Sequence, residues 1–199
     1  MAYTRKDAFY KKAKQEGYRS RAAYKLLELN RAWRFLRARN RVIDLGSWPG
    51  GWVQVAAKAV GPSGRVLGID LVKLEPLPLA NVTLMQGDAT DPAQQQNLLA
   101  ALGRPADVVL SDMAPKLSGV READDARVSV LCQTALTCCD SLLKPGGSLF
   151  LKTFMSTEYQ PFVAALRTAF RTVKTSRPEA TRKGSAEVYV LASGRKNMV

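Results

Sequence analysis

Short apolar runs alternate with stretches of helical spacing from about residue 41 to the end of the chain. The apolar runs are short and most are rich in Val, Leu and Ile, which is typical of buried strands. These runs are RVIDLG, RVLGID, VTLMQGD, DVVLSD, GSLFLKTF, RTVKT and EVYVLAS. Such an alternation predicts an α/β fold with a mostly parallel sheet and helices on both faces.

Before residue 41 the apolar residues are spaced as on one face of a helix. We expect Ser20 to cap a helix that runs from Arg21 to about Asn30, with Leu26 and Leu29 facing the core. Lys25 then lies on a neighbouring stripe of this helix.

Two connections later in the chain carry turn signals. Pro76 and Pro78 mark a loop, and the segment LLKPGG predicts a tight turn from a helix into a strand.

A chain of 199 residues predicts a single domain over residues 1–199. No apolar stretch approaches the length of a membrane span, and the N-terminus lacks the apolar segment of a secretory signal. We therefore expect a monomeric cytoplasmic protein with no membrane partner. A basic mitochondrial leader is the alternative interpretation of the first residues.

The positive charge is concentrated at the two ends of the chain. Residues 1–41 hold 13 Lys and Arg against 3 acids, residues 42–170 hold 10 against 12, and residues 171–199 hold 7 against 2. Basic ends on a nearly neutral body predict a surface for the phosphates of a nucleic acid, with an RNA-binding segment at about residues 1–40. A solvated basic face without a ligand is the alternative. The expected phosphate contacts are Arg5, Lys6, Lys11, Lys12, Lys14, Arg19, Arg21, Arg34 and Arg37, with Arg182 and Lys183 on a later basic loop.

Cysteine and histidine usage limits the possible chemistry. Cys132, Cys138 and Cys139 crowd one helix-like segment, where we expect them to pack in the core of a protein from a reducing compartment. The chain has no histidine and no CxxC pair, so we expect no metal site. Any general base must be Lys, Asp, Glu or Tyr.

The turn DLGSWPGGW follows a predicted strand and opens a predicted helix. Gly46, Gly50 and Gly51 therefore stand where a backbone can approach a ligand closely. The turn is not GxGxxG, and Pro49 and Trp52 leave little room for a pyrophosphate. A tight strand-to-helix connection without a ligand is the alternative interpretation.

Four aspartates follow the ends of predicted strands, at the edge where open α/β sheets bind ligands. These are Asp44, Asp70, Asp88 and Asp112. One or two of them could be helix N-caps, but four on one edge favour a ligand with hydroxyls, an amine and positive charge. S-adenosylmethionine has all three, so we expect Asp70 to accept from the ribose hydroxyls and Asp88 from the adenine amine.

Lys25, Asp112, Lys152 and Glu187 form a second set of polar residues, which the predicted sheet brings to the same rim. Lys and Glu rarely stay at the end of a buried strand without a partner. With the glycine turn, these residues suggest an enzyme that methylates a hydroxyl of RNA. The alternatives are a solvated Lys25 and a structural ion pair between Lys152 and Glu187.

From about Asp7 to Arg195 the chain resembles the FtsJ family of RNA 2′-O-ribose methyltransferases. The resemblance is carried by DAFYKKAKQEGYRSRAAYKLLEL, DLGSWPGGW, QGD, SDMAP, LKTF and EVYVLASG. It implies a Rossmann-like class I methyltransferase fold with a seven-stranded sheet, S-adenosylmethionine as the cofactor and a Lys-Asp-Lys-Glu tetrad of the four residues named above. The family loop usually has small residues where this chain has Ser47 and Trp48.

The chemistry assigns a role to each member of the tetrad. A ribose hydroxyl is a poor nucleophile until it loses its proton, and a buried lysine beside a second cation gives up its own proton more readily than an exposed one. We therefore expect Lys152 to be the base and Asp112 to orient it beside the methyl donor. Lys25 and Glu187 then hold the hydroxyl and its developing charge. The expected cofactor-binding residues are Asp44, Gly46, Gly50, Gly51, Trp52, Asp70, Asp88 and Asp112.

Competing functions fit the sequence less well. SDMAP lacks the Asn/Asp-Pro-Pro-aromatic turn of enzymes that methylate amines, and the cysteines lie outside a loop where they could attack cytosine. A catalytically inactive RNA-binding module and a nicotinamide oxidoreductase remain as alternatives. Our first choice of substrate is a uridine of large-subunit ribosomal RNA, and the alternative is the transfer-RNA anticodon loop.

Overall fold

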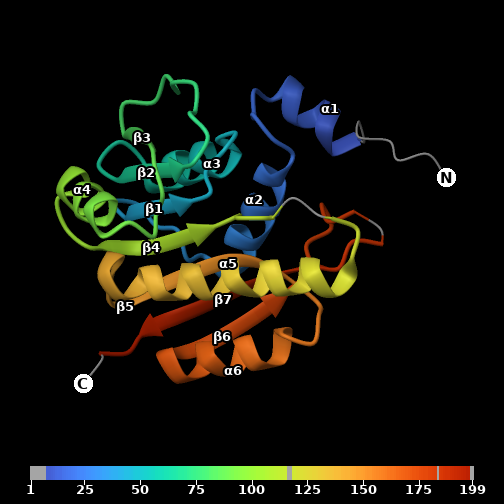
Figure 1. The fold of residues 1–199 in the computed structure, drawn as a ribbon. Helices are drawn as coiled ribbons and strands as arrows, with labels where there is room; N and C mark the ends of the chain where they lie inside the picture. Colours follow the sequence, from blue (N-terminus) through green and yellow to red (C-terminus); the bar gives the residue numbers. More distant parts are fainter. Residues whose placement is uncertain (1–7, 116–117, 183, 198–199) are drawn as a thin grey trace.

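The computed structural model describes residues 8–115, 118–182 and 184–197. Seven strands form one sheet in the order β3-β2-β1-β4-β5-β7-β6 (Figure 1). The first five strands are parallel, and β7 is antiparallel to both of its neighbours. The strands are β1 (Arg41–Leu45), β2 (Arg65–Asp70), β3 (Val82–Gln86), β4 (Ala106–Ser111), β5 (Leu143–Phe154), β6 (Phe170–Ser176) and β7 (Glu187–Arg195). The helices are α1 (Ala8–Gln15), α2 (Ala22–Trp33), α3 (Gly51–Val60), α4 (Pro92–Leu102), α5 (Arg121–Leu142) and α6 (Tyr159–Ala169).

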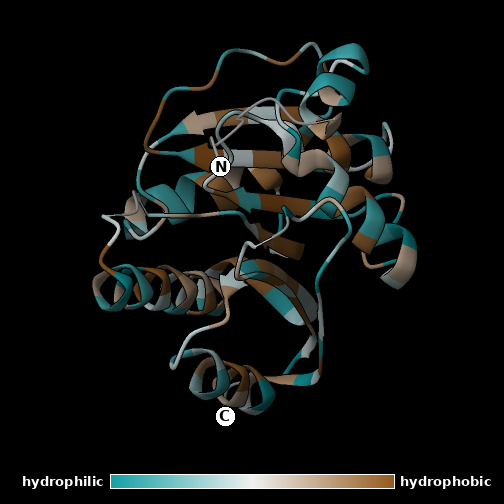
Figure 2. Cartoon of the chain, turned by 90° about the vertical axis from the view of Figure 1, so that its right-hand side faces the viewer, coloured by the Kyte–Doolittle hydropathy of each residue, from teal (hydrophilic) through white to brown (hydrophobic). Residues whose placement is uncertain are grey.

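Helices cover both faces of this sheet, which confirms the predicted fold class. Successive side chains of a strand point to opposite faces, so Ile43 joins a core with α4, α5 and α6, whereas Val42 joins a core with α2 and α3. Figure 2 shows the apolar strands between the helices. Two cores of buried aliphatic side chains therefore hold the sheet edges in fixed positions.

Aromatic side chains fill the core between α2, α3 and the sheet. Phe150 stacks on Phe35 with ring centroids 4.8 Å apart, and the Trp52 ring lies 5.2 Å from Phe150. The Nε1 atom of Trp52 donates to the carbonyl of Ala22 at 2.9 Å. Trp52 is thus buried in the core, and it also lines the small cavity at the glycine turn, so its contact with a cofactor stays a prediction.

The start of α2 differs from the prediction. The helix begins at Ala22 after Arg21, and no side chain caps its N-terminus. Ser20 lies against the glycine turn instead, because a Cβ added at Gly51 would lie 2.2 Å from its Oγ. The prediction that Ser20 is the N-cap is therefore wrong, since close packing against Gly51 determines where its hydroxyl lies.

The connection between α5 and β5 is also more extended than a simple turn. Leu143 pairs with Ala106 and Ser148 pairs with Val108, so the residues between them bulge out of the ladder. Gly146 supplies the positive φ of 76° inside this bulge. The predicted turn therefore lies within the first part of β5.

Candidate active site

The ends of the parallel strands bring the predicted site residues to one edge of the sheet. Asp44 lies near the end of β1, Asp70 ends β2, and Asp112 follows β4. Because β7 runs in the opposite direction, its first residue, Glu187, reaches the same edge. We call this edge of the sheet the carboxyl edge.

Lys152 and Asp112 form the first ion pair of the site. Ser111 pairs with Leu151 in the ladder between β4 and β5, so the next residues of the two strands are neighbours. The Nζ atom of Lys152 donates to Oδ1 of Asp112 at 2.7 Å and to its carbonyl oxygen at 2.9 Å. Only 8% of the Lys152 side chain is exposed. The ammonium of Lys152 is therefore fixed by two oxygens of one residue.

Lys25 and Glu187 form the second ion pair, between the first turns of α2 and the start of β7. The exposed fractions of the two side chains are 10% and 21%. Burial acts to raise the pKa of Glu187, but the ammonium of Lys25, assisted by Lys152 and Arg21, lowers this pKa below its ordinary value. Glu187 is therefore ionised at neutral pH.

Tyr189 lies between the two ion pairs, and sequence reasoning did not identify it. It is the cross-strand neighbour of Lys152, and the Nζ atom of Lys25 lies 5.4 Å from the centroid of its ring. Its hydroxyl donates to Oε2 of Glu187 at 3.5 Å. Burial, followed by the charges of Asp112 and Glu187, raises the pKa of Tyr189 well above its ordinary value. The available signal was its place two residues after Glu187, on the same face of the strand.

The glycine turn between β1 and α3 needs its small residues. Gly46 and Gly50 have φ values of 72° and 110°, which favour glycine. A Cβ at Gly46 would lie 2.6 Å from Cγ of Met113, which follows β4. The turn therefore lies close against the neighbouring strand end.

Asp44 is a buried carboxylate without a partner. Its exposed fraction is 0%, and neither carboxylate oxygen has a hydrogen bond within the described part of the chain. Burial, followed by the charges of Asp112 and Asp70, raises its pKa well above the ordinary value. A small cavity at this point is lined by Ser20, Asp44, Gly46, Ser47, Trp48, Pro49, Gly51, Trp52 and Asp112. An unpaired buried polar group of this kind calls for an explanation, and a ligand with donors or positive charge provides one.

Asp70 and Asp88 both shape loops at this edge. Asp70 accepts from the backbone N–H of Trp48 at 2.9 Å and from that of Val72 at 2.8 Å. Oδ1 of Asp88 accepts from the backbone N–H and the hydroxyl of Thr90, which lower the pKa of Asp88. Neither aspartate caps a helix. Each carboxylate retains acceptor capacity for a ligand.

The structure explains how the chain accommodates Ser47 and Trp48. Ser47 is buried opposite Gly68 of β2, where a Cβ would lie 2.8 Å from its Oγ. The Trp48 side chain is 59% exposed. The larger side chains therefore pack beside a glycine or point outward.

The predicted phosphate contacts lie in several separate parts of the structure. Arg5, Lys6 and Lys183 lie outside the described residues. Lys11, Lys12 and Lys14 are exposed on α1, which packs against Tyr24 of α2 and Ala180. Arg182 is in the loop that leads into Glu187. These described residues border the carboxyl edge.

Arg19 and Arg21 instead connect segments of the protein. The guanidinium of Arg19 donates to the carbonyls of Pro49, Glu75 and Pro76, and that of Arg21 donates to the carbonyl of Ala180. These bonds fix the loops around the carboxyl edge.

Arg34 and Arg37 follow α2 and precede β1, so they lie at the opposite edge of the sheet.

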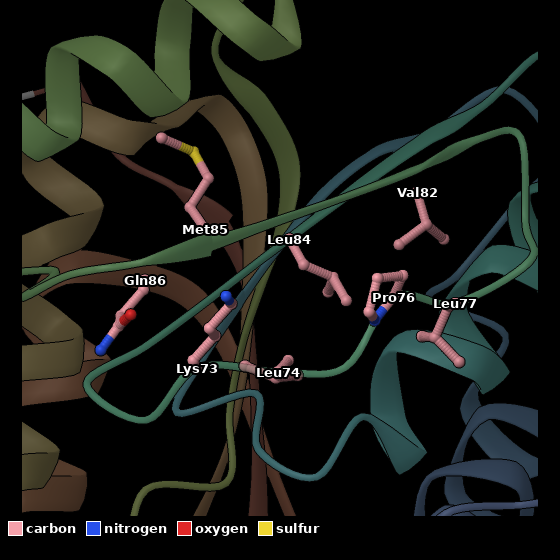
Figure 3. A pocket seen from close by; sticks show the side chains of 8 residues that line it. All are labelled: Lys73, Leu74, Pro76, Leu77, Val82, Leu84, Met85 and Gln86. Carbon is pink, nitrogen blue, oxygen red and sulfur yellow. The ribbon is translucent and has the colours of Figure 1, made fainter.

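A cavity of about 350 Å³ lies beside the site, between the loop after β2 and strand β3. Figure 3 shows Leu74, Pro76 and Leu77 around it, with Leu84 on β3 and Met85 turned to the other side of the strand. Its lining contains none of the predicted site residues. The cavity is therefore separate from the two ion pairs.

Cys132, Cys138 and Cys139 are buried and free, which confirms their predicted place in the core. Burial raises the pKa of each thiol. Among the described residues there is no cluster of three or more side chains suited to a metal ion. None of the described helices is long and apolar enough to span a membrane.

Comparison with known proteins identifies a family. The sequence model of the family described as FtsJ-like methyltransferase matches residues 18–195. The chain is 45% identical to ribosomal RNA large subunit methyltransferase E of Syntrophobacter fumaroxidans over 191 residues, which cover 96% of each chain. It is 46% identical to the protein of the same name in Marinobacter nauticus over 189 residues, which cover 94% of this chain and 90% of the relative.

Two solved structures are similar to this one. A crystal structure described as a ribosomal RNA methyltransferase from Plasmodium falciparum has a TM-score of 0.80 at 25% identity, covering 91% of this chain and 100% of that one. Fibrillarin of Aeropyrum pernix, crystallised with S-adenosylmethionine, has a TM-score of 0.60 at 17% identity, covering 88% of this chain and 75% of that one. The second likeness concerns the fold alone.

Proposed function

Because the chain belongs to the FtsJ-like methyltransferase family, we propose that it transfers a methyl group from S-adenosylmethionine to a ribose 2′-hydroxyl of large-subunit ribosomal RNA. The observation that carries this proposal is the pair of buried ion pairs, Lys152 with Asp112 and Lys25 with Glu187, beside the glycine turn. The names of the relatives support ribosomal RNA as the substrate. We propose a uridine as the methylated nucleotide, and a monomer that acts in the cytoplasm.

The residues of the carboxyl edge fit the cofactor. Asp44 offers an unpaired buried carboxylate, and the backbone at Gly46 and Gly51 is free of side chains that would fill the turn. We propose that Asp70 and Asp88 accept hydrogen bonds from the ribose hydroxyls and the adenine amine. When bound, S-adenosylmethionine supplies a methyl group on a positively charged sulfur. The carboxylate of Asp112 suits that positive charge, and a bound cation also favours the ionised form of Asp44, whose proton is otherwise retained in the folded protein.

Lys152 is the proposed base. Its Nζ atom is held by the carbonyl and the carboxylate of Asp112, which fix its position next to the glycine turn. Only a neutral amine can receive the hydroxyl proton, so the ammonium of Lys152 first releases a proton to solvent, and the two oxygens of Asp112 keep the resulting amine oriented. Asp112 is then the residue that orients Lys152 and borders the cofactor.

Lys25 and Glu187 are the proposed positioning pair for the ribose. The ionised carboxylate of Glu187 can accept a hydrogen bond from the ribose, while the ammonium of Lys25 stabilises negative charge that develops on the oxygen. Tyr189 stays protonated at neutral pH, so its hydroxyl can donate a hydrogen bond to the carboxylate of Glu187.

Mapping of 2′-O-methyl groups in total RNA, with and without the gene, tests this function. We expect one position of large-subunit ribosomal RNA to lose its methyl group in the absence of the gene, and to regain it when purified protein and cofactor are added. Loss confined to transfer RNA would contradict the proposed substrate. No change in any RNA would support the inactive RNA-binding module instead.

A further inference from the structure

The edge of the sheet opposite the active site carries a second concentration of positive charge. It lies where β1, β2, β4 and β5 begin. We call it the amino-edge cluster, and its members are Arg34, Arg37, Arg39, Arg41, Arg65, Arg104 and Lys144. The family motifs and the catalytic chemistry use none of these residues.

Hydrogen bonds and strand pairing place the first members of the cluster side by side. The Nε atom of Arg37 donates to the carbonyl of Arg34, and the backbone N–H of Arg37 bonds to the side chain of Asn40. Arg41 and Arg65 are partners in the ladder between β1 and β2. Residues that are scattered in the sequence therefore form one surface.

Asp107 joins the remaining members to this surface. Its carboxylate accepts from the backbone N–H of Arg41 at 2.7 Å and from Arg104 at 2.8 Å, and it pairs with Lys144 at 2.6 Å. The side chain of Asp107 is only 8% exposed. One buried carboxylate thus neutralises only a small part of the charge of the cluster.

The outer arginines have no acidic partner. Arg34, Arg37 and Arg39 are exposed, and within the described ranges no carboxylate pairs with any of them. Exposed guanidinium groups without ion pairs are available to a polyanion, and their planar donors match the oxygens of phosphate. This surface therefore fits a chain of phosphates.

Two of the outer arginines have an uncommon backbone conformation. Arg34 and Arg39 have φ values of 53° and 68°, and they are the only described residues other than glycine with positive φ. Glycine is the usual residue in this conformation because a Cβ there is strained. Glycine at both positions would therefore remove two cations without straining the backbone.

We propose that the amino-edge cluster binds phosphates of the substrate RNA at a segment remote from the methylated nucleotide. The parallel strands between the two edges have five or six residues in β1, β2 and β4, which corresponds to about 17 to 20 Å. One RNA segment can occupy the active site while another passes the amino edge. This inference rests on the proposed function, because it takes the substrate to be a long folded RNA.

The double variant Arg34→Gly/Arg39→Gly tests the proposal, because glycine suits both backbone positions. We expect it to melt at or above the wild-type temperature, and to bind a long fragment of large-subunit ribosomal RNA about tenfold more weakly at low salt. The slope of log affinity against log salt should fall by about 0.7 to 0.9 for each phosphate contact removed. Affinity for a short hairpin that reaches only the active site should be unchanged.

The matched control is Arg34→Lys/Arg39→Lys, which keeps both charges and should keep most of the affinity. Lys174→Ala, an exposed change on β6, controls for net charge. Wild-type affinity and salt slope in the glycine variant would overturn the proposal. So would a loss of binding to ribosomal particles but not to protein-free RNA, since it would indicate an acidic protein as the partner.

The failure of this inference can be distinguished from the failure of the proposed function. If the wild-type protein transferred no methyl group to ribosomal RNA, the proposed function would fail whatever the binding data show. If the wild type is active and the glycine variant binds like it, only the amino-edge proposal fails.

Discussion

Two buried aspartates at opposite edges of the sheet have opposite environments. Asp44, at the carboxyl edge, has no hydrogen-bond partner among the described residues, and its pKa is raised by burial and by neighbouring carboxylates. Burial also opposes the ionisation of Asp107, at the amino edge, but Arg104, Lys144 and the backbone of Arg41 outweigh it and lower its pKa to about 2. The carboxylate of Asp44 has no hydrogen-bond donor within the described part of the protein, whereas the carboxylate of Asp107 has several donors.

This difference distinguishes residues that bind a ligand from residues that stabilise the fold. A buried charge without a partner destabilises the free protein, so its presence points to a ligand that completes it. A buried charge held by several donors needs no ligand. The following predictions test whether catalysis and cofactor binding depend on the carboxyl edge, and stability and RNA binding on other parts of the molecule.

The largest effect is expected at the carboxyl edge. Lys152→Ala removes the proposed base, so methyl transfer should fall by about 10² to 10⁴-fold. Affinity for S-adenosylhomocysteine, measured by calorimetric titration, should stay close to wild type because Asp44 and the glycine turn remain. Near-normal turnover would show that another group takes the proton. Lys174→Ala is the control for the loss of a lysine in a strand.

Asp44→Asn should separate binding from stability. The loss of a charge-assisted hydrogen bond, about 1.5 to 3 kcal/mol, should weaken S-adenosylhomocysteine roughly 10 to 100-fold. Because the raised pKa makes folded Asp44 hold a proton that the unfolded chain releases, it lowers stability as pH rises above the ordinary Asp range. The variant should therefore melt higher than wild type at neutral pH, with a smaller decline toward high pH. A lower melting temperature combined with unchanged affinity would remove Asp44 from the cofactor site.

Asp107→Asn should show the reverse behaviour. A pKa lowered to about 2 stabilises the folded state above the ordinary Asp range, and this contribution is lost as pH falls from about 4 to 2. At pH 7 the variant should lose about 2 kcal/mol of unfolding free energy in urea, and it should approach wild type near pH 2. Cofactor affinity should not change. An equal loss at every pH would mean that packing, not charge, is responsible.

The smallest effect is expected on α1. Lys11→Ala/Lys14→Ala should raise the RNA KM about two- to fivefold at low salt and reduce its salt dependence, because exposed phosphate contacts are screened. Turnover at saturating RNA should be unchanged. A salt dependence equal to that of wild type would exclude these lysines from the phosphate contacts.

The elements of the fold could be predicted because their apolar patterns are local. Each of the seven predicted apolar runs became a strand, and the sheet order then brought Asp112, Lys152 and Glu187 to one edge, where Lys25 of α2 meets Glu187. The expected roles group Lys152 with Asp112 and Lys25 with Glu187, but the sequence alone could not exclude the alternative ion pair of Lys152 with Glu187. Pairing depends on the register between strands that are distant in sequence, and the structure shows Lys152 with Asp112 and Lys25 with Glu187.

Other features depend on contacts that no local pattern encodes. Ser20 has the sequence of an N-cap, yet the close approach of Gly51 determines its environment. Arg19 stays a predicted phosphate contact, but its hydrogen bonds to three backbone carbonyls distant in sequence could not be predicted. The amino-edge cluster combines basic residues from four separate segments, so counting charge along the chain identified only Arg34 and Arg37.

The position of β7 has a consequence for protein synthesis. This strand is the last of the described elements in the chain, yet it lies between β5 and β6 and contributes Glu187 to the active site. A nascent chain on the ribosome therefore keeps two open strand edges until Glu187–Arg195 has emerged. A product of premature termination would lack half of the second ion pair and expose unpaired strands, so it would be both inactive and a ready target for proteolysis.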